Sequence, residues 1–170
     1  NKSNIKYIIL RYFNVVGADK KNKIGEIGNK DRLFNNISKK IKGNEKNINI
    51  YGGDYKTNDG TCIRDYIHVY DLANIHIKCL EKIKKIKKST DLNCSYGKGY
   101  SVLEIAKTFQ KLFNKKIKIS FRKRRIGDMK EIVASNKKLN KFINWTPKFN
   151  NLNKMVKSTF TWNRYLDKIL

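Results

Sequence analysis

Hydrophobic residues follow two different spacings along this chain, and the two alternate. Apolar and β-branched residues fill the segment 5–16, which predicts a buried strand. Shorter strands are predicted at 48–51, 92–94 and 116–121. Helical spacing, with apolar residues three and four positions apart, predicts helices at 32–42, 69–86, 102–113 and 151–166. This alternation of strands and helices indicates an α/β fold.

Local signals sharpen this outline. Ser101 and Glu104 have the spacing of a capping box, so the helix at 102–113 should begin there. The helix at 69–86 should bury a stripe made of Leu72, Ile75, Cys79, Leu80 and Ile83. Polar or glycine-rich segments predict loops at 19–30, 52–60 and 122–130. The long opening strand has no later strand of similar length, so we expect part of a larger sheet to lie outside this chain.

Length and composition exclude several classes of protein. The 170 residues, of which 39% are hydrophobic, suit about one globular domain. No apolar stretch approaches the roughly 20 residues of a membrane span, and the start, at Asn1, does not resemble a signal peptide. Cys62, Cys79 and Cys94 are too few and too scattered for a zinc site or a disulfide framework. We therefore expect no metal and a reducing, cytoplasmic setting.

The net charge of +25 leaves two interpretations open. A strongly basic chain is typical of proteins that bind nucleic acid, and a basic RNA-binding module is the first alternative. However, seven of the 39 basic residues are Arg and the rest are Lys, spread along the whole chain together with abundant Asn and Ile. Because these three residues share A/T-rich codons, we favour compositional drift and expect no nucleic-acid partner. The charge would still attract an anionic ligand.

Motifs for chemistry are absent from the sequence. It contains neither the glycine-rich turn of a dinucleotide site nor the phosphate loop of a nucleotide hydrolase. It contains no Tyr followed four residues later by Lys, the pair that a reductase of this general type needs. No residue is therefore predicted to be catalytic.

Three segments carry candidate binding residues. Arg64 ends a turn-rich loop just before a predicted helix, where its guanidinium could bind phosphate oxygens in pairs, or could simply pair with Asp65 at the surface. Arg124, Arg125 and Asp128 surround a glycine; the segment could be a solvated loop or a small basic patch for RNA, but a pure RNA patch would have little use for Asp128, and the mixture of charges suits a nucleotide. Asn14, at the end of the opening strand, lies where α/β sheets bind ligands, although taken alone a turn-forming Asn is the favoured interpretation. His68 is expected to be a packed structural histidine.

Together these segments resemble the UDP-glucose 4-epimerases, which are extended short-chain dehydrogenases/reductases of the NAD-dependent epimerase family. The segment 10–18, LRYFNVVGA, is similar to their LRYFNxxGA stretch. The segment 54–69, DYKTNDGTCIRDYIHV, is similar to their long and specific DYxTxDGTxxRDYIHV segment. Shorter matches are GKGYSV at 97–102, RRIGD at 124–128 and WTP at 145–147. Order and spacing agree over nearly the whole chain.

The resemblance implies a role for each matched residue. Phe13 would contact the nicotinamide side of the NAD pocket, and Asn14 would bind the substrate near its diphosphate. Arg64 and Arg125 would bind the diphosphate, and Asp128 the uridine ribose. The rest of the UDP-sugar site would be formed by Leu33, Asn49, Ile50, Tyr51 and, near the sugar, Ile132. Arg32 departs from the family, which usually has Asn or His at that position.

The resemblance also implies what lies outside the chain. Residues 1–18 would be the last strand region of a truncated Rossmann sheet, and residues 19–170 the UDP-sugar-binding domain. The N-terminal Rossmann half would hold NAD, the catalytic Tyr and Lys, and the helices of a homodimer. This chain alone should be inactive. Another UDP-sugar epimerase or decarboxylase of the same family is the nearest alternative.

Overall fold

The computed structural model describes residues 5–28, 32–43 and 45–170. The helices are α1 (Leu33–Lys42), α2 (Val69–Ile83), α3 (Val102–Leu112), α4 (Lys137–Ile143) and α5 (Leu152–Ile169). The strands are β1 (Ile8–Tyr12), β2 (Asn14–Val16), β3 (Asn47–Tyr51), β4 (Ile63–His68), β5 (Thr90–Cys94), β6 (Gly99–Ser101), β7 (Lys118–Arg122) and β8 (Glu131–Ile132). The predicted α/β class is confirmed.

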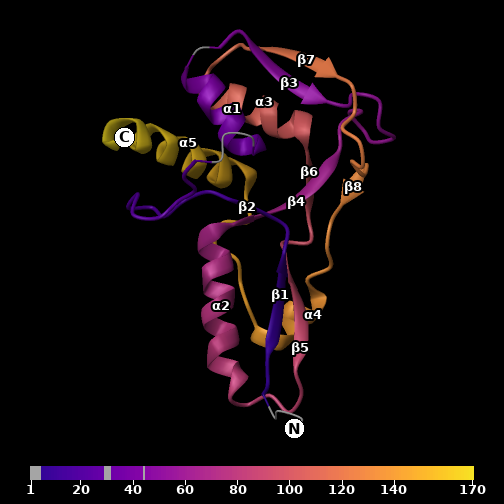
Figure 1. Cartoon of the computed structure of the whole chain (residues 1–170), viewed down its shortest axis with the longest axis vertical. Coiled ribbons are helices and arrows are strands. Elements are labelled where there is room, and N and C mark those ends of the chain that lie inside the picture. Colours follow the sequence, from indigo (N-terminus) through magenta and orange to yellow (C-terminus); the bar gives the residue numbers. More distant parts are fainter. Residues whose placement is uncertain (1–4, 29–31, 44) are drawn as a thin grey trace.

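In the part of the chain that the structure describes, the strands form three small sheets along the length of the molecule (Figure 1). At one end, β1 runs parallel to β5 beside α2 and α4. In the middle, β4 pairs with β2, β6 and β8. At the other end, β3 runs parallel to β7 beside α1, α3 and α5. Strand β4 therefore joins the two ends and is the centre of the fold.

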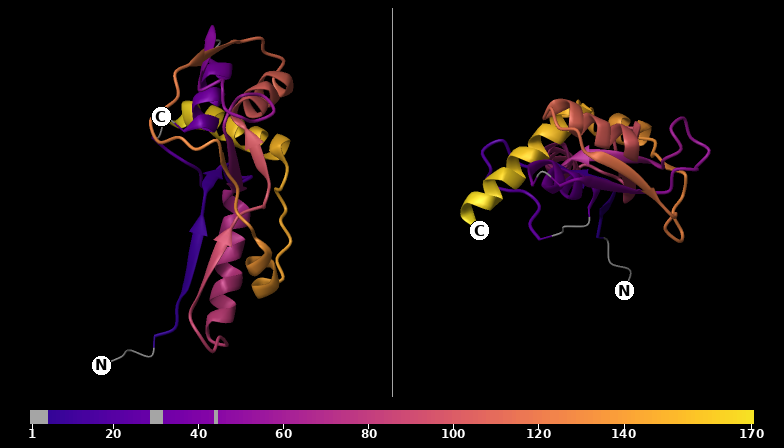
Figure 2. Two further views of the ribbon diagram at one scale, coloured as in Figure 1. Left: turned by 90° about the vertical axis from the view of Figure 1, so that its right-hand side faces the viewer. Right: turned by 90° about the horizontal axis from the view of Figure 1, so that it is seen from above.

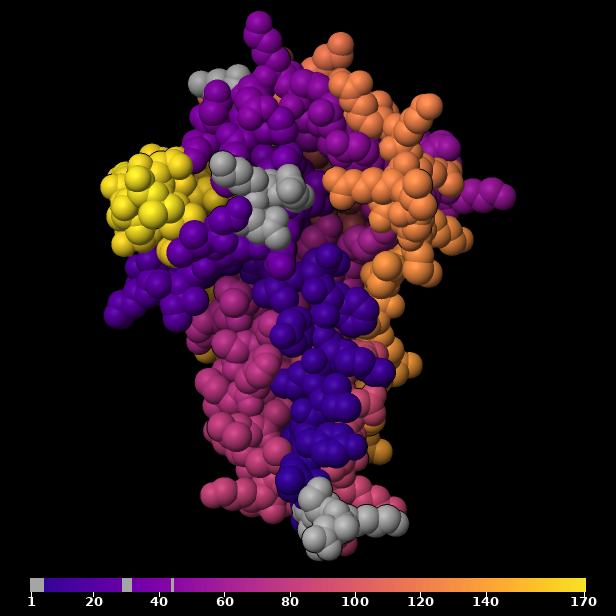
Figure 3. Space-filling model, viewed as in Figure 1, coloured from indigo at the N-terminus to yellow at the C-terminus, as the bar shows by residue number. Residues whose placement is uncertain are grey.

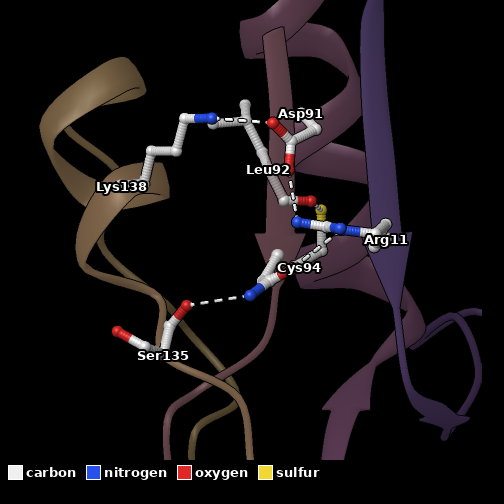
Figure 4. Close-up of polar contacts among 7 residues, drawn as sticks. Arg11, Asp91, Leu92, Cys94, Ser135 and Lys138 are labelled. Atoms are coloured by element: carbon white, nitrogen blue, oxygen red, sulfur yellow. Dashed lines mark hydrogen bonds and ion pairs between the residues drawn. The ribbon is translucent and has the colours of Figure 1, made fainter.

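The opening strand differs from its prediction. It breaks at Phe13 into β1 and β2, which pair with different strands. The expectation that it has no partner of its own length was wrong, since β1 pairs with β5 residue for residue over five residues. Only residues 92–94 of β5 were predicted, because the strand begins with polar residues: Asp91 accepts from Arg11 of β1 and from Lys138 of α4, 2.8 Å from the Lys138 Nζ (Figure 4).

Strand β4 was missed altogether, because residues 61–68 were assigned to a loop and to the approach to a helix. Its last four residues, 65–68, are all buried, so the alternation that reveals a half-buried strand is absent. Two of the four, Asp65 and His68, are polar and fully buried. A short buried strand with polar residues carries no hydrophobic signature. The brief elements β6, β8 and α4 were missed as well.

The helices match their predictions more closely. The capping box of α3 is present, with Ser101 and Glu104 bonding each other's main chain. Leu72, Ile75 and Cys79 are buried on α2, as predicted, but Leu80 is 71% exposed. One residue along a helix turns a side chain by about 100°, which carries Leu80 off the stripe that ends at Cys79. Helix α2 also ends at Ile83, three residues earlier than predicted.

The helices cover the strands differently at the two ends of the molecule. Helices α1, α3 and α5 bury Ile37, Phe109 and Met155 against one another at the end that carries β3 and β7. At the other end, α2 and α4 lie on one side of the β1–β5 pair (Figure 2), and the opposite side of β1 forms part of the molecular surface (Figure 3). Ile9 and Tyr12 of β1 are about half exposed there, at 50% and 52%.

The predicted division of the chain after residue 18 stays a prediction. Residues 1–4 of its first part lie outside the described residues. The loop predicted at 19–30 is free of helix over 19–28, and residues 29 and 30 lie outside the described residues.

Within the part of the chain that the structure describes, no helix combines the length and the apolarity needed to cross a membrane.

Candidate nucleotide-binding site

A cavity of about 710 Å³ lies where β2, β3, β4 and the start of α1 meet the loop 123–130. It contains nine of the ten residues predicted to bind substrate or cofactor. They are Phe13, Asn14, Leu33, Asn49, Ile50, Tyr51, Arg64, Arg125 and Asp128. The tenth, Ile132, is not part of the cavity lining; it pairs with Arg64 as the last residue of β8.

Arg64 enters the cavity from the middle of the fold. It lies on β4, not at the end of a loop as the sequence suggested, and its side chain is only 13% exposed. Its Nη1 donates to the carbonyl of Ile63 at 2.9 Å, and its Nη2 to Oδ1 of Asp128 at 3.2 Å. The alternative partner, Asp65, is fully buried and faces the main chain of Tyr96 and Ala134. The strand alternation that sends Asp65 inward sends Arg64 to the cavity.

Arg125 reaches the cavity from the exposed loop between β7 and β8. Its guanidinium carbon lies 4.4 Å from the centre of the Tyr51 ring, in a cation–π contact. Among the described residues, no carboxylate forms an ion pair with Arg125. Its planar fork is therefore available to an anion without the loss of an existing ion pair.

The remaining charges of the cavity are paired. Arg32 contacts Glu26, with 2.9 Å between Nε and Oε1, and Arg64 contacts Asp128. Lys40 is bonded to Glu45, which is not part of the lining. Four cationic and two anionic side chains line the space, since Arg32, Lys40, Arg64 and Arg125 face Glu26 and Asp128. The surplus of positive charge favours an anionic ligand.

Strand β2 and helix α1 supply the uncharged wall. Asn14 donates from Nδ2 to the carbonyl of Asp65 at 2.9 Å, which ties β2 to β4 and leaves its Oδ1 as an acceptor. Leu33 is the first residue of α1, and its N-cap, Arg32, makes no side-chain capping bond. Asn49 and Tyr51 lie on the same face of β3, because they are two residues apart, and Ile50 points into the core with 1% exposure.

Sequence reasoning missed several residues of the lining, among them Cys62, Tyr66 and Glu26. Arg64 and Tyr66 are two residues apart on β4, so a correctly predicted β4 would have placed both on one face, with Cys62 just before the strand. Burial raises the pKa of the Cys62 thiol, which keeps it protonated and a poor nucleophile. No sequence signal marked Glu26, which lies in the loop before α1.

His68 is a structural residue, as expected. Its Nδ1 accepts from the main-chain N–H of Tyr70 at 3.1 Å, so its proton lies on Nε2, 3.0 Å from Oγ of Ser158. Burial lowers the pKa of His68 to about 4, against the smaller opposing effect of Asp71. Ser158 already bonds both the N–H and the carbonyl of Ala18. This pair fastens α5 to β4 and does not form a nucleophile with its base.

Within the described residues, no group of three His, Cys, Asp or Glu side chains is placed to hold a metal ion. The cavity is lined by guanidinium groups, an ammonium group, amides, aromatic rings and two carboxylates. Its surplus of positive charge and its polar groups suit an anionic ligand.

Comparison with known proteins agrees with this chemistry. Residues 1–95 match the NAD dependent epimerase/dehydratase family. The chain belongs to this family. It is 36% identical to the UDP-glucose 4-epimerase of Azospirillum brasilense over 96% of its own length, and 40% identical to UDP-glucose 4-epimerase 2 of Arabidopsis thaliana over 94%. The UDP-arabinose 4-epimerase 1 of Arabidopsis thaliana is 37% identical over 95% of the chain.

Solved structures of family members share the fold. The UDP-glucose 4-epimerase of Stenotrophomonas maltophila, with bound NAD and formylated UDP-arabinopyranose, superposes with a TM-score of 0.92 at 30% identity. The Bifidobacterium longum enzyme in complex with NAD+ and UDP superposes at 0.86 and 34%. Each match covers 99% of this chain and 50% of the other. The chain thus spans about half the length of the relatives it matches. It covers 47% of the Azospirillum brasilense enzyme and 46% of UDP-glucose 4-epimerase 2 of Arabidopsis thaliana.

Proposed function

We propose that this chain supplies the UDP-sugar-binding part of an NAD-dependent UDP-glucose 4-epimerase, an isomerase that interconverts UDP-glucose and UDP-galactose in galactose metabolism. One observation carries the proposal. Arg64 on a central strand and Arg125 on a loop, 61 positions later in the sequence, line the same cavity together with Asp128. Two guanidinium groups and one carboxylate at one cavity match the two phosphates and the ribose of a nucleotide.

The nucleotide would lie along the cavity between the two arginines. Arg64 and Arg125 would bind the diphosphate, and the second oxygen of Asp128 would accept from a ribose hydroxyl. The exposed face of β3, with Asn49 and Tyr51, would lie beside the uracil, and Leu33 would close the same pocket from α1. Asn14 would contact the substrate near the diphosphate, with Ile132 towards the sugar.

Such an arrangement suits epimerisation at carbon 4 of the sugar. The sugar must present both of its faces to the same hydride carrier, so it has to turn while the nucleotide stays in place. The charged side chains of Arg64, Arg125 and Asp128 would provide the firm binding that the nucleotide needs. NAD would accept the hydride and return it to the opposite face.

These 170 residues would contact only the nicotinamide side of NAD. Phe13, partly buried at the break between β1 and β2, offers an apolar contact for a nicotinamide ring. The sequence has neither a glycine-rich turn for the pyrophosphate nor a Tyr-x-x-x-Lys pair. We therefore assign cofactor binding and catalysis to a region outside these 170 residues, and expect the full-length enzyme to be a cytoplasmic homodimer.

Calorimetric titration of the chain with UDP tests the proposal. UDP should bind, and Arg64→Ala or Arg125→Ala should each weaken binding about 10- to 100-fold, because each removes charge-assisted hydrogen bonds. Arg164→Ala is the matched control, since it removes the same charge from an exposed position of α5 outside the cavity. Purified chain should not convert UDP-galactose.

The same samples distinguish the RNA-binding alternative. An RNA-binding module would bind a short RNA with an affinity that falls steeply between low and moderate salt, and it would ignore UDP. A folded chain with no measurable affinity for UDP would refute the proposal, and turnover of UDP-galactose would refute the assignment of catalysis to another region.

A further inference from the structure

The loop 123–130, which carries Arg125 and Asp128, has little support from the core. Every one of its residues is exposed, and within it one main-chain bond, from the N–H of Asp128 to the carbonyl of Arg125 at 3.3 Å, closes a turn at Gly127. Main-chain hydrogen bonds hold the two ends of the loop. The N–H of Gly52 donates to the carbonyl of Arg122, and the N–H of Ile63 donates to the carbonyl of Lys130, both at 2.8 Å. Between these ends, side chains must hold the loop in place.

Arg124 makes the most extensive of these side-chain contacts. Its Nε lies 2.7 Å from Oδ1 of Asp54, and its Nη2 donates to the main-chain carbonyl of Asp54 at 2.6 Å. Its guanidinium carbon lies 4.2 Å from the centre of the Tyr55 ring. One side chain therefore combines an ion pair, a bond to the main chain and a cation–π contact on the segment 52–61.

The segment that Arg124 contacts is itself rigid. Tyr55 is 6% exposed, and its N–H bonds the carbonyl of Gly60 at 2.9 Å. Gly60 has a φ of +79°, and a Cβ there would lie 2.3 Å from the carbonyl oxygen of Gly53, so only glycine fits. Gly52, at φ +80°, packs as closely against the Tyr55 ring. Arg124 thus connects an exposed loop to a segment that is anchored by the buried Tyr55.

The other two contacts of the loop differ in one respect. The Arg64–Asp128 pair and the Arg125–Tyr51 contact both involve residues of the cavity lining, so a bound diphosphate would compete with them. Asp54, Tyr55 and Arg124 do not line the cavity. The Arg124 contact can therefore persist with and without ligand.

We propose that Arg124 is a positioning residue, which holds the loop 123–130 so that Arg125 and Asp128 face the cavity before a nucleotide arrives. This deepens the proposed function and rests on it, because it concerns how the same nucleotide site is organised. Arg124 contributes to affinity without touching the ligand, since a loop that is already ordered loses less conformational entropy on binding.

Backbone 15N relaxation of the unliganded chain tests the positioning role without any nucleotide. Residues 124–129 should have order parameters near those of the strands, about 0.8, and Arg124→Ala should lower them below about 0.6. Arg124→Lys should restore only part of the order, because an ammonium keeps the charge but not the planar fork. Arg164→Ala should leave the loop unchanged.

UDP titration of the same variants gives the second readout. Arg124→Ala should weaken UDP binding about three- to tenfold, a change within the range of exposed ion-pair and cation–π contacts. The melting temperature should stay near that of the wild type. Unchanged order parameters in Arg124→Ala would overturn the positioning role, as would loss of order with unchanged UDP affinity. If the wild type itself does not bind UDP, the proposed function fails, and the relaxation data alone decide whether Arg124 orders the loop.

Discussion

Strand β4 and the loop 123–130 bring the same chemical group to one cavity on supports of opposite kinds. β4 is the central strand, and Arg64 is followed there by four buried residues, 65–68. The loop is exposed throughout, and contacts of its own side chains hold Arg125 in place. The core therefore holds Arg64 in place, whereas side-chain contacts at the surface hold Arg125.

Two glycines with the same backbone conformation give the strongest test of that contrast. Gly17 has a φ of +83° and lies against the buried ring of His68, where a Cβ would be 2.3 Å from Nε2. Gly127 has a φ of +80° and no atom within 4 Å of such a Cβ. Gly17→Ala should lower the free energy of unfolding by about 3–5 kcal/mol, from backbone strain plus overpacking.

Gly127→Ala is the matched variant, because its added Cβ strains the backbone but meets no neighbouring atom. It should cost about 1–2 kcal/mol at most. Urea denaturation of both variants provides the free energies of unfolding. Equal losses would mean that the region around β4 is no more rigid than the loop.

The second prediction concerns pH and the C-terminal end of β4. Because the pKa of His68 in the folded chain is about 4, below the ordinary value of 6.5, the unfolded chain takes up a proton before the folded chain does. The contribution of neutral His68 to the free energy of unfolding is therefore fully present above pH 6.5. About 3 kcal/mol of this free energy is lost as the pH falls towards 4.

His68→Gln provides the control for this effect. Glutamine can still bond Ser158 but does not titrate, so the variant should lose less stability over the same pH range than the wild type does. Chemical denaturation at pH 7, 5.5 and 4.5 measures the difference. Parallel pH profiles for the two proteins would contradict the assignment.

The smallest expected effect separates the two arginines themselves. Arg64→Ala removes hydrogen bonds to Ile63 and Asp128 from a side chain that is 13% exposed, so it should cost about 1–2 kcal/mol of stability. Arg125→Ala removes one exposed cation–π contact and should cost less than about 1 kcal/mol. Thermal unfolding without ligand measures both, and a larger loss for Arg125→Ala would reverse the comparison.

The sequence identified the residues of the site more successfully than it identified their supports. Specific motifs carried Arg64, Arg125, Asp128 and Asn14, and nine of the ten predicted residues do line one cavity. Helices with a clear apolar stripe, such as α1 and α3, were also predicted. The helices were predicted from their own apolar patterns, whereas most of the site residues were predicted from the resemblance to the family's motifs; neither route needs knowledge of distant contacts.

The failures have a common physical cause, which is that polar residues within strands do not follow hydrophobic patterns. β4 contains the buried Asp65 and His68, and the unpredicted first part of β5 contains the partly exposed Asp91; the partners of all three come from distant segments. The pairing of Arg64 with Asp128, 64 positions away, displaced the local pairing with Asp65 for the same reason. Contacts of this kind are determined by tertiary structure and are invisible in a local window.

The most direct test of the central claim is a crystal structure of the chain with UDP. The account predicts that the diphosphate lies in the cavity between β4 and the loop 123–130, with Arg64 and Arg125 both within hydrogen-bonding distance of its oxygens. A diphosphate that contacts neither guanidinium group, or a UDP molecule bound elsewhere on the basic surface, would contradict it.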